Sequence, residues 1–257
     1  MSIRFKKFTV ADYGLDDLVK ADLDIDRLRR DLEEGIVFKI PHDIPLKVLE
    51  RFRNTMLDSL TYEDPGYIKR QFGGPNNFRV HWDDEHQATR GKFMSWSFYP
   101  WNASSFEWFD HFRNLFVLRN KLAGLSPDKY IDMADQDFVA RIAGQFYPSG
   151  AGYMEEHMDP HNVHQFAIPT MLLSSPGEDF INRGFFLLND QGEKVYIDHN
   201  LSFGDLFLFH TSIPHGVGLV DQHLELDKSK KLGRLMMIAA VNAVNDQNAF
   251  QSKSRQK

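Results

Sequence analysis

Two histidines and an aspartate, His157, Asp159 and His215, are the residues of this sequence best suited by type and spacing to hold a metal ion. Two imidazole nitrogens and one carboxylate oxygen on one side of an ion suit divalent iron and leave the opposite coordination positions open. Residues i and i+2 of a strand point to the same face, so we expect one strand to carry His157 and Asp159, with Met158 turned away. An H-x-D pair alone is weak evidence for a metal site in a chain with 11 histidines, so the prediction depends on the flanking segments.

The segments that flank these residues alternate between turn signals and short apolar runs. Residues 145–156 combine a strand, a Pro/Gly turn and the approach to the H-x-D pair. Ahead of His215, a Gly-Asp turn at 204–205 leads into the apolar run 206–209, and Gly-Arg opens a further apolar run at 233–241. Runs of this length and composition predict buried β-strands.

This order of parts resembles the Fe(II)- and 2-oxoglutarate-dependent dioxygenase superfamily, whose pattern is Y-x-x-G…H-x-D…G-D-x-x-x-F…H-x-V…G-R, over residues 141–244. The resemblance implies Fe(II), with 2-oxoglutarate and O2 as co-substrates, and assigns His157, Asp159 and His215 as the iron ligands at the catalytic centre. It also implies oxidation of an unactivated C–H bond while 2-oxoglutarate becomes succinate and carbon dioxide. Halogenases of this kind carry Gly or Ala in place of the carboxylate, so Asp159 favours hydroxylation.

Arg234 is expected to bind the co-substrate. A guanidinium is always charged and can hold a carboxylate through two parallel hydrogen bonds. Strand alternation would turn Arg234 inward with Met236 and Ile238, and the resemblance implies that it binds the C5 carboxylate of 2-oxoglutarate. The gap between His215 and Arg234 is nearly twice the family's usual one, and we interpret the charged insert 221–232 as an extended hairpin loop that absorbs the difference.

Other assignments for the co-substrate site stay open. Arg234 could form an ordinary ion pair at the barrel rim, and Arg141 and Arg183 are then the substitutes. Gln145 and Tyr147 share one face of their strand, and the resemblance implies that such residues contact 2-oxoglutarate. The equally simple alternative is a Tyr147 that packs in the core with its hydroxyl hydrogen-bonded.

Three further histidines, His161, His164 and His210, are near enough in sequence to compete as ligands. His210 ends the apolar run, whereas His215 precedes Gly-Val, where the resembled family carries its distal histidine, so we assign His215. The alternatives are histidines that serve only packing, or a site that binds zinc as a cupin does.

Substrate contacts are predicted from the region ahead of the barrel and from the segment after the H-x-D pair. All four tryptophans fall in one stretch of mixed charge, and aromatic walls with mixed charges would suit a small zwitterion. For Trp108 we prefer packing of a helix against the barrel. The predicted substrate residues are Asn162, His164, Arg79, Trp82 and Asp83.

Composition narrows the class of protein. The chain has 257 residues, 22 of them Phe, which indicates one domain with a thick apolar interior. A net charge of −6 argues against a nucleic-acid partner, and the lack of cysteine excludes disulfides and thiolate catalysis. Neither a signal peptide nor a membrane-spanning stretch is identified, so we expect a cytoplasmic protein with no membrane partner.

The predicted fold class is α+β with a mostly β core. Helices are expected within 1–35, over 45–60 and over 105–123, the last with a capping box of Ser104 and Glu107, and a strand is expected over 36–40. Residues 64–103 are interpreted as irregular, and strands dominate from 137 to 244. The resemblance implies a double-stranded β-helix, or jelly-roll barrel, supported by the N-terminal helices. One domain would span 1–245, with a helical and lid region over 1–136, a barrel core over 137–245 and a polar tail over 246–257.

These observations favour an Fe(II)- and 2-oxoglutarate-dependent hydroxylase of a small polar metabolite. A free amino acid, including a lysine-like one, or a derivative is the expected substrate. The alternatives are a hydroxylase of a protein side chain and a cupin-type protein that binds a metal or small molecule without redox turnover.

Overall fold

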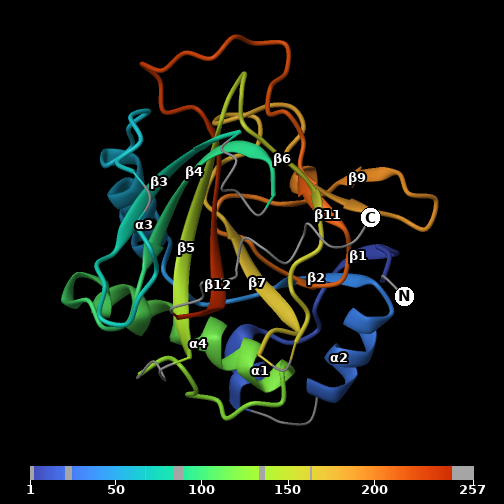
Figure 1. The fold of residues 1–257 in the computed structure, drawn as a ribbon. Helices are drawn as coiled ribbons and strands as arrows, with labels where there is room; N and C mark the ends of the chain where they lie inside the picture. Colours follow the sequence, from blue (N-terminus) through green and yellow to red (C-terminus); the bar gives the residue numbers. More distant parts are fainter. Residues whose placement is uncertain are drawn as a thin grey trace, which may run out of the picture.

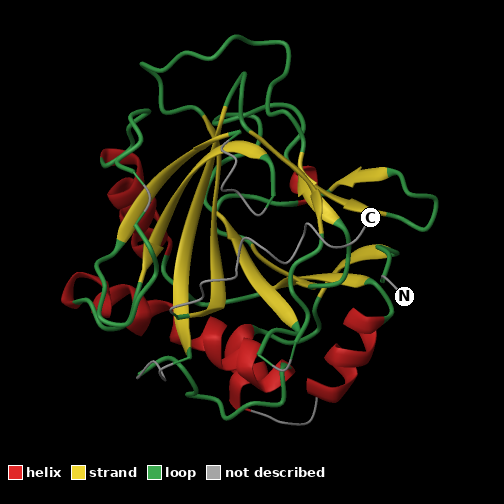
Figure 2. Ribbon diagram, in the orientation of Figure 1, coloured by secondary structure: helices red, strands yellow, loops and turns green. Residues whose placement is uncertain are grey.

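A curled sheet of twelve strands is the framework that positions the predicted metal ligands (Figures 1 and 2). The computed structural model describes residues 3–20, 25–66, 68–83, 89–132, 137–162 and 164–244. Neighbouring strands follow the order β1-β2-β10-β7-β12-β5-β4-β6-β11-β8-β9, and β3 pairs with β4. The strands are β1 (Lys7–Val10), β2 (Ile36–Ile40), β3 (Asn77–Trp82), β4 (Gly91–Phe98), β5 (Phe138–Pro148), β6 (Tyr153–His157), β7 (Ala167–Leu172), β8 (Phe185–Leu188), β9 (Lys194–Tyr196), β10 (Leu206–His210), β11 (His215–Val217) and β12 (Gly233–Ala243).

Strand β4 joins the two parts of this sheet. Its residues 94–98 pair with β5 in the larger part, and its residues 91–92 pair with β6, which continues into β11, β8 and β9. Apolar side chains from the inner faces of both parts pack into one cluster, which includes Met154, Phe185, Phe207 and Met236. Two curled parts that enclose a common interior are the jelly-roll arrangement of a double-stranded β-helix, so the predicted fold class is confirmed.

The long β5–β12 pair separates an apolar outer face from a more polar inner face. Its register runs from Gly233 opposite Pro148 to Ala243 opposite Phe138. Because successive strand residues alternate between faces, one set packs outward into the main core and the other faces the barrel interior. The inward residues of β5 include Arg141, Gln145 and Tyr147, and those of β12 include Arg234 and Met236.

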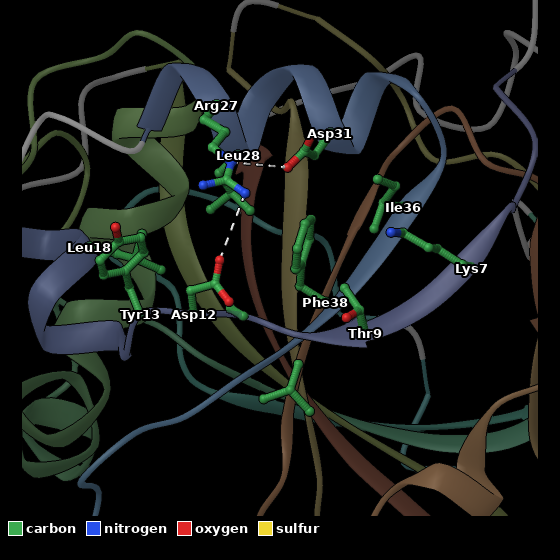
Figure 3. A pocket seen from close by; sticks show the side chains of 12 residues that line it. Lys7, Thr9, Asp12, Tyr13, Leu18, Arg27, Leu28, Asp31, Ile36 and Phe38 are labelled. Carbon is green, nitrogen blue, oxygen red and sulfur yellow. Dashed lines mark ion pairs between the residues drawn. The ribbon is translucent and has the colours of Figure 1, made fainter.

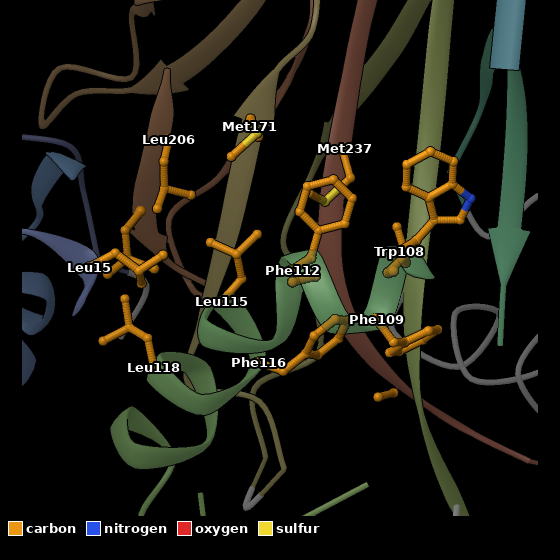
Figure 4. Close-up of a cluster of buried hydrophobic side chains, with 14 of the residues drawn as sticks. Leu15, Trp108, Phe109, Phe112, Leu115, Phe116, Leu118, Met171, Leu206 and Met237 are labelled. Carbon is orange, nitrogen blue, oxygen red and sulfur yellow. The ribbon is translucent and has the colours of Figure 1, made fainter. Parts of the chain in front are cut away.

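Helices cover the outer face of the larger part of the sheet. They are α1 (Leu15–Lys20), α2 (Ile25–Glu33), α3 (Leu46–Asp58) and α4 (Phe106–Leu122), with short 3₁₀ turns at Ala103–Ser105 and Asp198–Asn200. Figure 4 shows α4 directing Phe112 and Leu115 toward Met171 and Met237 of the sheet. Trp108 belongs to this core and lies 4.9 Å from Phe52 between ring centroids, so its predicted packing role is confirmed.

Strands β3 and β4 lie in the region 64–103, which the sequence predicted to be irregular, so that prediction was wrong. The two strands pair antiparallel along their length, with Val80 and Trp96 in the main core. Their inner face includes Arg79, His81 and Ser95. Residues 77–82 alternate polar with apolar, which is a strand signal, but the Gly, Pro and Asn residues around them pointed to an irregular segment.

The N-terminal lead-in is only partly helical. Strand β1, which the sequence analysis did not predict, pairs in parallel with β2. The helical prediction is confirmed over α1 and α2, and Gly35 follows α2 with a φ of 90°, as expected of a residue just past a helix end. Asp24 of the predicted helical stripe and the predicted tail 246–257 lie outside the described residues.

The two longer helices are confirmed, with corrections at their N-termini. Leu46 was expected on the buried stripe of α3 but is 59% exposed. The capping box of α4 is not formed, because no side chain caps that helix. Ser104 instead accepts a hydrogen bond from Asn76, and Glu107 binds Arg51.

Among the described residues, no helix combines the length and apolar character that crossing a bilayer requires.

Candidate metal centre

His157, Asp159 and His215 converge at the junction of β6 and β11. The Nε2 atom of His215 lies 3.2 Å from Asp159 Oδ2, and His157 Nε2 lies 3.8 Å from Asp159 Oδ1. The two imidazole centroids are 4.4 Å apart, and one ligand atom from each residue lies within 4.8 Å of the other two. Three ligands this close can share one ion, as the sequence predicted.

Strand pairing brings the two histidines together, since His157 of β6 lies directly opposite His215 of β11. The expectation that one strand carries the whole H-x-D pair needs correction, because β6 ends at His157. Asp159 follows the strand, and its backbone N–H donates to the Thr211 carbonyl (3.2 Å). Met158 is about half exposed and turns away, as predicted.

Backbone carbonyls fix the orientation of both imidazoles. His157 Nδ1 lies 3.0 Å from the carbonyl oxygen of Glu155, and His215 Nδ1 lies 2.8 Å from that of Ile213. A carbonyl only accepts hydrogen bonds, so each Nδ1 carries the proton and each Nε2 presents a lone pair toward Asp159. This is the arrangement that metal-binding histidines adopt, and the nitrogen, nitrogen and carboxylate donors fit Fe(II).

Aromatic rings shield one side of the centre. Phe209 and Phe185 lie 4.9 and 5.5 Å from the His215 ring between centroids, and His215 is only 4% exposed. Asp159 and His157 keep some exposure, so the cluster is accessible to solvent on its other side.

The competing histidines are engaged elsewhere. His210 packs against His161 and Phe166, and burial lowers the pKa of His210 to about 4, with the nearby His161 adding to the shift. His161 Nδ1 lies 3.2 Å from the Thr211 hydroxyl. The choice of His215 over His210 therefore agrees with the geometry.

Arg234 points into the interior and is completely buried, in a pair with Asp198. Its Nε and one Nη donate to the two carboxylate oxygens of Asp198 at 2.5 and 3.0 Å. The other Nη atom donates to the thioether of Met236 (2.9 Å), which is a weak acceptor. Asp198 thus neutralises the guanidinium and fixes its orientation. The Nη atom of Arg234 that does not bind Asp198 is directed toward Met236 on the inner face.

Tyr147 and Gln145 lie beside Arg234 on the inner face. Tyr147 pairs with Arg234 in register, and its hydroxyl donates to Gln145 Oε1 (2.8 Å). Burial raises the pKa of the Tyr147 phenol above its ordinary value, so the phenol is a neutral donor. The ring stacks on Phe93 at 5.4 Å, so Tyr147 also packs in the core, as the alternative reading held.

The predicted substrate residues separate into two groups. Arg79 lies on the inner face of β3, next to His81, whose Nε2 is 2.8 Å from the Ser95 hydroxyl. Trp82 lies on the opposite face against Tyr62, and is 37% exposed.

The remaining predicted contacts lie in loops around the barrel. Asp83 accepts a hydrogen bond from Tyr153 at the outer end of β3. Asn162 is exposed and accepts the backbone N–H of His164, whose ring packs 3.8 Å from Phe138. The structure therefore brings Arg79 alone of the five to the polar inner wall.

Sequence reasoning missed Asp198, the partner of Arg234, and Arg70, which lies near Arg141. Asp198 sits in the sequence Ile-Asp-His-Asn, where nothing marks a buried acid. Of the two arginines named as substitutes for Arg234, Arg183 is exposed in a loop and Arg141 faces the interior.

A separate hollow of about 220 Å³ lies between β1, β2 and the first two helices (Figure 3). Its lining comes from residues 7–38 and includes Lys7 and Phe38, with Arg27 paired to Asp12 and Asp31 at its edge. None of these residues belongs to the metal cluster, so the hollow is distinct from the candidate centre.

No protein-family model and no curated protein sequence matches this chain. Solved structures do. The non-heme alpha-ketoglutarate-dependent epimerase SnoN from nogalamycin biosynthesis is 11% identical, with a TM-score of 0.51 over 86% of this chain and 84% of that one. A Pseudomonas putida prolyl-4-hydroxylase is 13% identical, with a TM-score of 0.49 over 86% and 99%. A Trichoplax adhaerens prolyl hydroxylase is 12% identical, with a TM-score of 0.49 over 94% and 98%.

At 11% identity the similarity to SnoN concerns only the path of the chain, over 86% of its length. Together with the two-part curled sheet, it identifies the architecture expected from the sequence. The chain has the double-stranded β-helix fold found in the 2-oxoglutarate- and Fe(II)-dependent oxygenases.

Proposed function

We propose that this protein is an Fe(II)- and 2-oxoglutarate-dependent oxygenase that hydroxylates a small polar metabolite. The observation that carries the proposal is the cluster of His157, Asp159 and His215, with both Nε2 atoms turned toward the carboxylate. When bound, Fe(II) with 2-oxoglutarate and O2 supplies oxidation of an unactivated C–H bond, with succinate and carbon dioxide as the co-products.

The surrounding residues bind, orient and exclude water. Arg234 holds one carboxylate end of 2-oxoglutarate through the guanidinium edge that Asp198 leaves available, and the neutral Tyr147 phenol lies next to it. Gln145 completes this polar patch. Phe185, which lies under both Arg234 and His215, keeps this side of the site dry.

Asp159 supplies the carboxylate that completes the set of three protein ligands. A halide would need that coordination position, so hydroxylation is favoured over halogen transfer. The substrate is a small polar molecule such as a free amino acid, because the partly exposed inner-wall residues Arg79, His81, Ser95 and Gln145 are all polar.

Succinate formation tests the proposal. Purified protein supplied with Fe(II), ascorbate, 2-oxoglutarate and air should form succinate slowly, and faster when a substrate is added. Replacing Fe(II) with Zn(II) is the control and should give none. A protein that binds both metals but never forms succinate would be a metal-binding protein without redox turnover, contrary to the proposal.

A further inference from the structure

Two arginines, Arg70 and Arg141, lie together near the end of the inner face remote from Arg234. Arg141 lies opposite Ala240 of β12, whereas Arg234 lies opposite Tyr147. At about 3.3 Å per strand residue, the six positions from Tyr147 to Arg141 span roughly 20 Å. Arg70 Nη1 donates to the carbonyl of Ala243 (3.0 Å), the last residue of β12. The positive charge of Arg70 contributes to a lowered pKa of Arg141.

Among the described residues, neither Arg70 nor Arg141 forms an ion pair with a carboxylate. Arg141 Nη1 donates to the Ser97 hydroxyl (3.1 Å), but the Nε–H groups of both arginines are buried and have no acceptor among the described residues. Both side chains keep partial exposure, but an N–H donor withdrawn from water without an acceptor is unfavourable. Burial, with the charge of Arg70 adding to it, lowers the pKa of Arg141 to about 10, which still leaves the group charged at neutral pH.

An unsatisfied acceptor lies at the same end of the barrel. Asn242 is an inward position of β12, and its side-chain Oδ1 is buried without a hydrogen-bond partner among the described residues. Asn242 and Arg141 both keep partial exposure, although most outward residues of their strands are fully buried. The partial exposure of Asn242 and Arg141 is therefore toward the inner face of the sheet.

The metal cluster lies toward the Arg141 end of the inner wall. The backbone N–H of Asp159 donates to the carbonyl of Thr211, which follows β10 at the end that pairs with the start of β7. In the register of β7 with β12, this end of β7 lies on the side of Ala240, which is the residue opposite Arg141. The charge of Asp159 also acts on Arg141. A five-carbon co-substrate held at Arg234 is much shorter than the separation of the two arginine sites. The second site is thus left for a second ligand.

We infer that Arg70 and Arg141 bind the carboxylate of the substrate and that Asn242 accepts a hydrogen bond from its amino group. A small molecule that offers both groups is a free amino acid or a close relative. The inference rests on the proposed oxygenase function and adds to it the residues that select the substrate. Charge-assisted hydrogen bonds to a carboxylate are among the stronger polar contacts, so the selection should be measurable.

Calorimetric titration of the protein loaded with Mn(II) and 2-oxoglutarate tests this without turnover. The ligands are the common free L-amino acids and, for each one that binds, its neutral carboxamide. At least one amino acid should bind, and its carboxamide should bind about tenfold more weakly or worse. Arg141→Gln should weaken binding of the acid by about tenfold or more, with little effect on the carboxamide or on 2-oxoglutarate. Arg183→Gln, at an exposed loop position, is the matched control and should change none of these affinities.

The inference is overturned if no free amino acid binds, or if Arg141→Gln leaves the affinity for the acid unchanged. Arg70→Gln repeats the test should Arg141→Gln lower the melting temperature too far to be measured. Succinate formation in the absence of substrate distinguishes failure of the substrate inference from failure of the oxygenase proposal. If that activity persists while amino acids fail to bind, the substrate inference alone is wrong, and if it is absent with Fe(II), the oxygenase proposal fails as well.

Discussion

At the residue scale, the candidate centre depends on hydrogen bonds that the sequence does not reveal. The residue types and spacing identified His157, Asp159 and His215. The carbonyls of Glu155 and Ile213 then decide which imidazole nitrogen is available to a metal. Each carbonyl lies two residues before its histidine, so the tautomer is set locally.

Replacing Asp159 should remove metal binding without unfolding the protein. Asp159→Ala takes away the only anionic ligand, while the partly exposed side chain contributes little to the core. We expect Fe(II) affinity to fall by a factor of about ten or more and succinate formation to disappear. Equilibrium dialysis with iron measures the first effect, with the exposed Asp190→Ala as control. Unchanged iron affinity would remove Asp159 from the ligand set.

Arg234 carries a structural role and a proposed binding role, which a double substitution separates. Arg234→Ala leaves Asp198 buried and unpaired, so the free energy of unfolding should fall by about 3–5 kcal/mol. Removing both partners, in Arg234→Ala with Asp198→Ala, should recover part of that loss because no isolated charge remains. Binding of 2-oxoglutarate should stay weak in both variants. If the double variant bound 2-oxoglutarate as the unmodified protein does, Arg234 would have no role in co-substrate binding.

At the element scale, stability and site geometry belong to opposite faces of the same strands. The outer face packs on the helices, and the inner face carries the polar wall. Phe112 lies at the centre of the outer core, fully buried between α4 and the sheet (Figure 4).

Shortening Phe112 should destabilise the protein and spare the site. Phe112→Ala leaves a cavity, and we expect a loss of about 3–5 kcal/mol in the free energy of unfolding, measured by urea denaturation. The exposed Phe106→Ala on the same helix should cost less than about 0.5 kcal/mol. Metal affinity at low temperature should be the same in both. A large loss of metal affinity in Phe112→Ala alone would show that the two faces are coupled.

Elements with a sustained apolar pattern were predictable from the sequence, and strands set among turn-forming residues were not. Helices α3 and α4 and strand β2 have clear apolar periodicity and were found. Strand β3 alternates apolar residues with Arg79 and His81, and β4 carries Ser95 on the same inner face, but the Gly, Pro and Asn residues around both strands pointed to a loop. Strand β1 owes its identity to pairing with β2, a tertiary contact that local sequence does not encode.

At the scale of the whole molecule, acid should destabilise the fold through His210. Its Nδ1 accepts the backbone N–H of Ser212 (3.1 Å), which requires the neutral imidazole. The pKa of His210 is about 4 in the fold, below the ordinary value near 6.5 that applies when unfolded, so the unfolded chain binds the proton first. This contribution is fully present above about pH 6.5 and is lost as the pH falls toward 4, by about 3 kcal/mol in total.

Urea denaturation between pH 7 and pH 4 measures the effect. His210→Gln keeps an acceptor but cannot titrate there, so its stability should fall less steeply with acid than that of the unmodified protein. The exposed His199→Gln should leave the slope unchanged. Equal slopes in all three proteins would contradict the assignment of a buried neutral His210.

The site as a whole was predictable to the extent that it consists of residues with distinctive chemistry in a short pattern. The metal cluster and Arg234 have that property. Asp198, Arg70 and Asn242 become relevant only because β12, β5 and distant loops meet around one interior. Their roles follow from burial and unmatched hydrogen-bonding groups, which only the folded chain defines.

The most direct test of the central claim is an anaerobic visible spectrum of the metal-free protein after addition of Fe(II) and then 2-oxoglutarate. An iron held by His157, Asp159 and His215 has open positions for the keto and carboxylate oxygens, so a charge-transfer band should appear only when both are present. Asp159→Ala should show no band. Tight binding of Zn(II) or Mn(II) by the unmodified protein, with no band on adding Fe(II) and 2-oxoglutarate, would contradict the account.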